Sequence, residues 1–206
     1  MKTDYAASVF INCPFDAEYR ALLFAKVFAV FDCGYLPRCS QEIEDGGEVR
    51  IEKIRNIIRE CKFGVHDISR IQVNGDPPLP RFNMPFELGL FVGARIYGGG
   101  DQKKKVCLIL DADKYRYQRS LSDIAGHDIQ EHGNDPEIVI KKIRNWLQNA
   151  TQRKTIPGGH IIVQRYRQFM AELPGICDTL NLQQDTLLFN EFALIVETWL
   201  KKKDPD

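Results

Sequence analysis

Residues 63–69 read FGVHDIS and residues 81–94 read RFNMPFELGLFVGA, and these two stretches decide the fold. The first is a short apolar run that ends in a carboxylate, which is typical of a buried strand in a parallel sheet. The second has apolar residues at helical spacing. A strand, a loop rich in proline and a helix in this order predict one strand-and-crossover unit, because neighbouring parallel strands need a long connection.

The same alternation of strands and helices continues on both sides of this unit. Apolar, β-branched runs predict the strands, and periodic apolar positions predict the helices. We therefore expect an α/β, flavodoxin-like doubly wound fold, with a mostly parallel five-stranded sheet and a C-terminal helical appendage. The expected strands are Val9–Asn12, Tyr35–Cys39, Phe63–Asp67, Val106–Leu110 and Asp128–Glu131. The expected helices run from the cap Asp16 to Gly34, and over about Val49–Cys61, Met84–Tyr97 and Pro136–Asn149.

The pattern changes after Asn149. The stretch TQRKTIPGG at 151–159 resembles a linker, and helical segments follow it. We expect an α/β domain at 1–150 and a helical appendage at 151–206, which packs on the core or on a second subunit. The expected segments are His160–Leu173, about Pro174–Asn181, and Asn190–Lys202 with Asn190 as N-cap.

Composition excludes several classes of protein. Of the 206 residues, 44% are hydrophobic and 27% charged, with 28 lysines and arginines against 28 aspartates and glutamates. This balance gives no support for a nucleic-acid or membrane-surface partner. No apolar run approaches the length of about 20 residues that spans a bilayer. The N-terminus lacks the apolar centre of a secretory signal, so we expect a cytoplasmic protein.

The six cysteines are scattered and form no CxxC pair. We expect them to be reduced and buried, and we expect no metal site, because cysteines and histidines do not approach ligand spacing. Cys13, at a strand end, is an alternative thiol nucleophile, although no histidine lies near it in the sequence.

Polar residues gather where the predicted strands end. In open parallel sheets, ligands bind beyond the carboxyl ends of the strands, so these residues are expected to form one rim. The candidates are Asn12, Pro14 and Phe15 after the first strand, Arg38 in the second, Asp67 and Ser69 after the third, and Arg81, Phe82, Asn83 and Glu87 further along.

Glu87 is the strongest candidate for a catalytic residue. It lies among apolar and small residues near the start of a helix, and a carboxylate is costly to bury without a partner or a task. Backbone N–H groups at that helix end favour its ionised form. Such a carboxylate can stabilise an oxocarbenium-like sugar cation or attack its anomeric carbon. The alternative is a helix-terminus charge or an ion-paired core glutamate.

Asp67, Asn12 and Ser69 each have two interpretations. Asp67 either orients a ribose hydroxyl and transfers a proton, or caps the turn after its strand. Asn12 and Ser69 suit hydrogen bonds to ribose or phosphate, but they equally suit turns.

The aromatic and basic candidates also have alternative interpretations. Phe15 and Phe82 suit stacking on a base or nicotinamide ring, or core packing. Arg38 and Arg81 favour a phosphate-bearing ligand, whereas the acidic loop at 42–48 disfavours a heavily phosphorylated one. His66 is expected to be structural.

Four segments carry a resemblance to known families: VFINCPFD (9–16), FGVHDIS (63–69), NMPFELGLFVGA (83–94) and KKVCLIL (104–110). Over about residues 8–148 the chain resembles the nucleoside 2-deoxyribosyltransferase-like fold. It is also similar to the Toll/interleukin-1 receptor (TIR) superfamily, many of whose bacterial members cleave the nicotinamide–ribose bond of NAD with a helix glutamate.

The resemblance implies that Glu87 is catalytic, that residues 12–15 form the ligand loop after the first strand and that Asp67 lies near the sugar. It implies an enzyme that breaks or transfers an N-glycosidic bond in NAD or a related nucleotide or nucleoside. NAD would be substrate, without a further cofactor, in a homo-oligomer with a role in bacterial defence or stress signalling. The alternatives are a nucleotide sensor without catalysis and a TIR-like assembly module. Three parts of the chain depart from the family pattern: the residues at 83–85, the stretch at 114–119 and the C-terminal helices.

Overall fold

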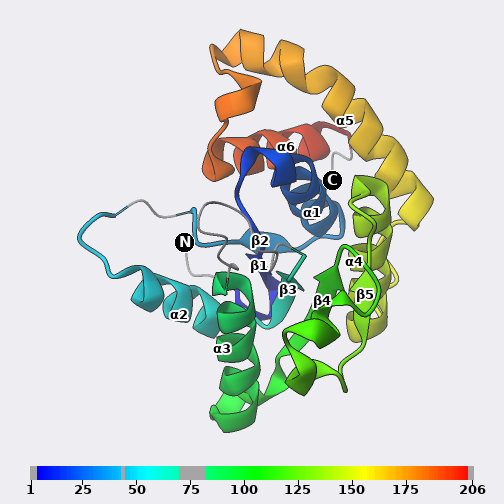
Figure 1. The fold of residues 1–206 in the computed structure, drawn as a ribbon. Coiled ribbons are helices and arrows are strands. Elements are labelled where there is room, and N and C mark those ends of the chain that lie inside the picture. Colours follow the sequence, from blue (N-terminus) through cyan, green and yellow to red (C-terminus); the bar gives the residue numbers. More distant parts are fainter. Residues whose placement is uncertain (1–3, 43–44, 70–81, 204–206) are drawn as a thin grey trace.

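The computed structural model describes residues 4–42, 45–69 and 82–203, and it confirms the predicted α/β architecture (Figure 1). All strands run parallel in one five-stranded sheet of order β2-β1-β3-β4-β5, the order of a flavodoxin-like fold. The strands are β1 (Ser8–Asn12), β2 (Leu36–Arg38), β3 (Phe63–Asp67), β4 (Val106–Asp111) and β5 (Ile129–Glu131).

Helices cover both faces of the sheet, as expected (Figure 1). The α-helices are α1 (Arg20–Asp32), α2 (Arg50–Glu60), α3 (Asn83–Tyr97), α4 (Pro136–Thr151), α5 (Gly159–Leu180) and α6 (Phe189–Lys203). Short 3₁₀ helices lie at Tyr5–Ala7, Ala17–Tyr19, Gly100–Lys104, Arg116–Arg119, Ser122–Ile124 and Gln184–Thr186. Of the described helices, none has the length and apolar character required to cross a membrane.

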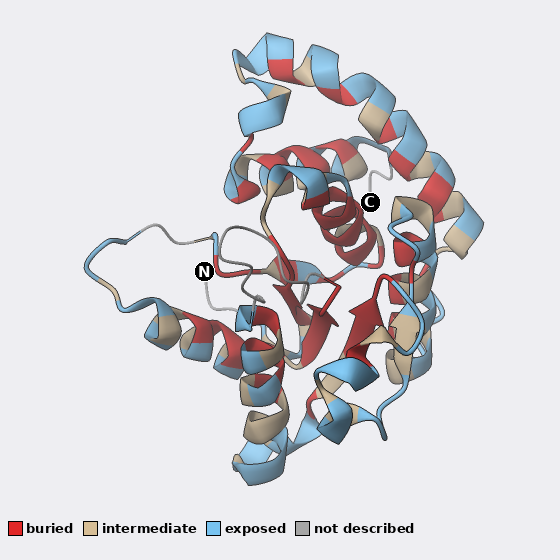
Figure 2. Ribbon diagram, viewed as in Figure 1, coloured by how far each residue is buried: buried red, intermediate tan, exposed pale blue. Residues whose placement is uncertain are grey.

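Alternating side chains of β1 divide the core into two layers. Val9 and Ile11 join the large cluster under α1, α4, α5 and α6, whereas Phe10 packs with α2 and α3 on the other face. This is the alternation that a strand imposes, and here both faces are apolar because both are covered. Figure 2 accordingly shows the central strands β1 and β3 buried along their length.

Two local predictions about the first half of the chain are confirmed. Gly34 ends the first helix with φ +78, a left-handed conformation that glycine adopts without strain. Pro37 lies in β2, an edge strand, where its missing N–H costs no ladder bond. The helix itself begins later than expected, because a 3₁₀ turn capped by Asp16 precedes Arg20.

The C-terminal segment differs from the prediction in one respect. Residues 159–180 form a single helix, α5, with Pro174 inside it, rather than two helices that meet at the proline. Pro174 is exposed, whereas Leu173 and Cys177 on the inner side are buried. Packing on that inner side therefore holds the helix together where the proline removes a backbone hydrogen bond.

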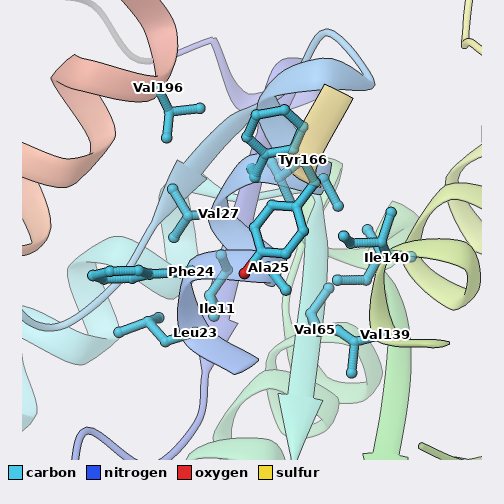
Figure 3. Packing of buried hydrophobic residues seen from close by; sticks show 14 of the residues in the cluster. Ile11, Leu23, Phe24, Ala25, Val27, Val65, Val139, Ile140, Tyr166 and Val196 are labelled. Carbon is cyan, nitrogen blue, oxygen red and sulfur yellow. The ribbon is translucent and has the colours of Figure 1, made fainter. Parts of the chain in front are cut away.

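The helices α5 and α6 pack on the α/β layer and share its core. Phe28 of α1 contacts Phe169 of α5 and Trp199 of α6, with ring centroids 5.3 and 6.1 Å apart. Figure 3 shows Tyr166 and Val196 converging on α1 from these two helices. Residues 151–203 are thus continuous with the main hydrophobic cluster.

Candidate functional site

The polar residues at the ends of β1, β3 and β4 meet at the carboxyl edge of the sheet, as a parallel sheet requires. Asn12, Asp67 and Asp111 are the last residues of these strands, and each is at most 1% exposed. The Asn12 side chain donates a hydrogen bond to the Met84 carbonyl in the first turn of α3. This bond brings the helix that carries Glu87 to the same edge.

Asp67 is fully enclosed by hydrogen-bond donors. Its Oδ2 accepts from the Lys26 ammonium group at 2.9 Å and from the Tyr19 hydroxyl, and Nε2 of His132 lies 3.0 Å away. Its Oδ1 accepts from the backbone N–H of Ser69 at 2.9 Å and from the Ser69 hydroxyl. We call these five residues the Asp67 cluster; it ties α1 to β3 and to the end of β5.

The pKa of Asp67 follows from these partners. Burial by itself would raise it, but Lys26, with His132 and Ser69, holds the pKa well below its usual range. The Asn134 N–H donates to Nδ1 of His132, so Nε2 is the ring nitrogen that faces Asp67. A direct contact between Asp67 and a sugar would require this carboxylate to leave its partners, whereas its bonds to Ser69 suit the turn-capping interpretation.

Asn12 links three elements. Its side-chain amide nitrogen donates to the Met84 carbonyl at 2.8 Å and lies 3.0 Å from Nδ1 of His66. Because that nitrogen is a donor, Nδ1 of His66 is the acceptor. Burial, and to a lesser extent Lys105, lowers the pKa of His66 to about 3, so the ring is neutral. Asn12 therefore fixes the start of α3 relative to β1 and β3.

Glu87 lies in the second turn of α3, and its burial opposes the ionised form that the sequence leads us to expect. The residue is 6% exposed, and burial raises the pKa of Glu87 to about 7, which Arg50 only partly opposes. The Arg50 guanidinium is 3.9 Å away and 60% exposed. Because the helix begins at Asn83, Glu87 lies beyond its first turn, where the dipole favours an ionised carboxylate most, and burial instead favours the protonated form.

The start of α3 also presents aromatic rings to solvent. Phe82 is 60% and Phe86 56% exposed, so Phe82 is not a core residue. Asn83 is exposed as the first residue of the helix. Arg81, predicted to favour phosphate, lies outside the described residues.

The other residues of the rim are engaged within the protein. Pro14 is buried, and Phe15 is half-buried against the main cluster. Arg38 donates through Nε to Glu42 at 2.7 Å and reaches Glu60 at 3.2 Å. A phosphate at Arg38 would therefore compete with two carboxylates.

Sequence reasoning missed Lys26, Tyr19, His132 and the pair Asp111–Arg116. Arg116, from the basic stretch at 114–119, donates to Asp111 and to the Ser69 carbonyl. Lys26 had a usable signal, since it is the lone charge in the apolar run ALLFAKVFAVF at 21–31. Tyr19, His132 and Arg116 lie in ordinary polar or mixed stretches. Asp111 directly follows the apolar run VCLIL at 106–110, and only the fold brings these four residues together.

Cysteine and metal chemistry receive little support at this edge. All six cysteines are free, and burial raises the pKa of the Cys13 thiol, which keeps it in its unreactive protonated form. Across 4–42, 45–69 and 82–203, no three histidine, cysteine, aspartate or glutamate side chains cluster as a metal site would need.

Comparison with known proteins adds no relative from which a function is transferable. No protein-family model matches the chain, and no curated protein or solved structure matches it significantly. The geometry of the site is therefore the basis for a functional proposal.

Proposed function

We propose that the protein cleaves or transfers the N-glycosidic bond of NAD or of a related nucleotide or nucleoside, with Glu87 as the catalytic carboxylate. The observation that carries the proposal is the environment of Glu87. It is a buried carboxyl group at the ligand-binding edge of a parallel sheet, and burial raises its pKa to about 7. A carboxyl group with a strongly perturbed pKa at such an edge is a functional candidate.

The contrast with Asp67 supports the assignment. The oxygens of Asp67 are occupied by the other residues of the Asp67 cluster, whereas the one described charge near Glu87 is the exposed guanidinium of Arg50 at 3.9 Å. Glu87 thus retains acceptor capacity for a ligand, and Arg50 is placed to offset its charge at the moment it ionises.

The chemistry requires one carboxylate near the anomeric carbon. As the C1′–N bond breaks, its electron pair leaves with the base, and positive charge develops on the ribose. The Glu87 carboxylate stabilises that charge or bonds to C1′, after which water or a second acceptor takes the sugar. A cationic nicotinamide riboside favours the ionised form of Glu87 on binding, because opposite charges lower the pKa of a carboxyl group.

The experiment compares the protein with its Glu87→Gln variant on NAD, NADP and a panel of nucleosides, with products identified by chromatography and mass spectrometry. Glu52→Gln is the matched control, because Glu52 lies on the exposed face of α2 and pairs with Arg55. We expect turnover by the protein and the control, and a loss of about 10² to 10⁴ in rate in Glu87→Gln. Equal turnover by all three would refute the assignment.

The alternative function, a nucleotide sensor without catalysis, is favoured by the enclosure of Asp67, which removes the second carboxylate from reach. In this alternative Glu87 only hydrogen-bonds a ribose, and it predicts tight nucleotide binding by calorimetry with no product after long incubation.

A further inference from the structure

A cavity of about 300 Å³ lies at the seam between the start of α1 and the start of α6. Phe15, Arg20 and Phe24 line it from the α/β layer, and Phe192 and Asn190 line it from α6, with Gln41 from the loop after β2. Its volume is at the lower end of the range for small-molecule sites, about 300 to 1,000 Å³.

The two walls of this seam cavity are fixed relative to each other. Phe24 and Phe192 stack across the seam with ring centroids 3.6 Å apart and planes within 8°. Arg20 donates to the Gln184 carbonyl at 3.2 Å, and Asn190 donates to the Glu42 carbonyl at 2.8 Å. The cavity is therefore a built feature of the joined layers, since three separate contacts hold the helices in place around it.

The lining combines flat apolar surface with amide and guanidinium groups. Phe15 is half-buried and is the most accessible of the three rings, because Phe24 and Phe192 stack on each other and are 5% and 1% exposed. The Arg20 guanidinium lies 6.0 Å from the centre of the Phe24 ring. The bond from Asn190 to Glu42 uses its amide nitrogen and leaves its amide oxygen to accept. The Gln41 side-chain amide bonds no other described residue. Aromatic faces with asparagine, glutamine and arginine beside them are the groups with which proteins stack and read nucleobases.

We propose that the seam cavity binds a nucleobase, carried by a nucleoside or a mononucleotide, at a site separate from Glu87. The base inserts against the aromatic surface, and its polar edge meets the amides of Gln41 and Asn190. A volume of about 300 Å³ suits a nucleobase, and the rest of a larger ligand would extend beyond the cavity. This site does not depend on the proposed catalysis, because Glu87 is not among its lining residues.

The test measures binding of adenosine, guanosine, cytidine and uridine by calorimetry, with the Glu87→Gln variant to prevent turnover. Leu188→Trp fills the cavity from a residue that lines it and is 54% exposed. Leu194→Trp is the matched control, because Leu194 lies on α6, is 64% exposed and does not line the cavity. Both sites tolerate a larger side chain because they face solvent.

We expect at least one nucleoside to bind with a dissociation constant below about 1 mM. Leu188→Trp should weaken that binding at least tenfold, and Leu194→Trp should leave it unchanged. Failure of all four to bind, or equal binding by the two tryptophan variants, would overturn the proposal. Gln41→Ala is a second test that leaves the packing of the cavity unchanged. It should weaken binding of the preferred nucleoside more than binding of the others. Nucleoside binding at this cavity together with no turnover by the wild-type protein would count against the proposed catalysis alone.

Discussion

Asp67 and Glu87 are both buried carboxyl groups at one edge of the sheet, yet their pKa values move in opposite directions. Five hydrogen-bonding or charged contacts surround Asp67, whereas the described charge nearest to Glu87 is an exposed guanidinium 3.9 Å away. Burial raises both pKa values, and only the partners of Asp67 outweigh it. One of these carboxyl groups therefore stabilises the fold, while the other costs stability when it ionises.

Glu87→Gln is expected to make the protein more stable at high pH. The pKa of Glu87 is about 7 in the folded protein and 4.5 for an unperturbed glutamate. Between these pH values the folded state therefore binds more protons than the unfolded state. Stability is then lost as pH rises from about 4.5 to 7, by an upper bound of about 3 kcal/mol at 1.36 kcal/mol per pKa unit. Glutamine does not ionise, so the variant does not lose this stability.

Urea denaturation at several pH values checks this expectation. Glu87→Gln and the wild type should be similar at pH 5, and the variant should exceed the wild type by about 1 to 3 kcal/mol at pH 8. The exposed Glu52→Gln control should follow the wild type throughout. A constant difference between Glu87→Gln and the wild type across this pH range would contradict the assigned burial.

Lys26→Met is expected to be strongly destabilising. It leaves the Asp67 charge fully buried without its ammonium partner, a loss of about 3 to 5 kcal/mol in comparable cases. Adding Asp67→Asn should recover part of this loss, because the double variant has no uncompensated charge. Lys104→Met is the control, since Lys104 forms an exposed pair with Asp101 and should leave stability nearly unchanged. Equal effects at the two lysines, measured by chemical denaturation, would argue against the Asp67 cluster as a stabilising unit.

At the scale of elements, the start of α3 depends on a bond from another strand. The amide nitrogen of Asn12 donates to the Met84 carbonyl, three residues before Glu87. Asn12→Ala removes this donor and should cost about 1 to 3 kcal/mol. The first turns of α3 should then exchange their amide hydrogens faster, while exchange in α2 stays unchanged. Faster exchange in both helices, or in neither, would show that Asn12 does not position α3.

Element types were predictable where the pattern is local. The run FGVHD gave the bounds of β3, and Gly34 and Pro37 marked a helix end and an edge strand through their own backbone chemistry. The helix α5 was not predictable in one piece, because contacts of Leu173 and Cys177 with other helices override the proline between them.

At the scale of the whole molecule, the set of residues at the carboxyl edge of the sheet was predictable. The hydrogen bonds and ion pairs among them were not. Alternation of strands and helices places Asn12, Asp67 and Glu87 at one edge. The pairing of Asp67 with Lys26 and His132 joins residues that are far apart in the chain, so no local pattern reveals it. The pKa of Glu87 likewise depends on burial by the assembled layers.

The shared core predicts that residues 1–152 do not fold stably alone. The helices α5 and α6 cover Phe24 and Phe28 of α1, so a chain ending at Gln152 exposes aromatic surface that is buried in the whole molecule. We expect it to lose cooperative thermal unfolding and its near-ultraviolet circular dichroism, and to self-associate. Removal of residues 201–206, of which 201–203 are described and exposed, is the control and should leave cooperative unfolding intact. If the chain ending at Gln152 instead unfolds cooperatively at the wild-type temperature, residues 153–206 are an independent appendage and their shared cluster contributes little to the stability of the α/β layer.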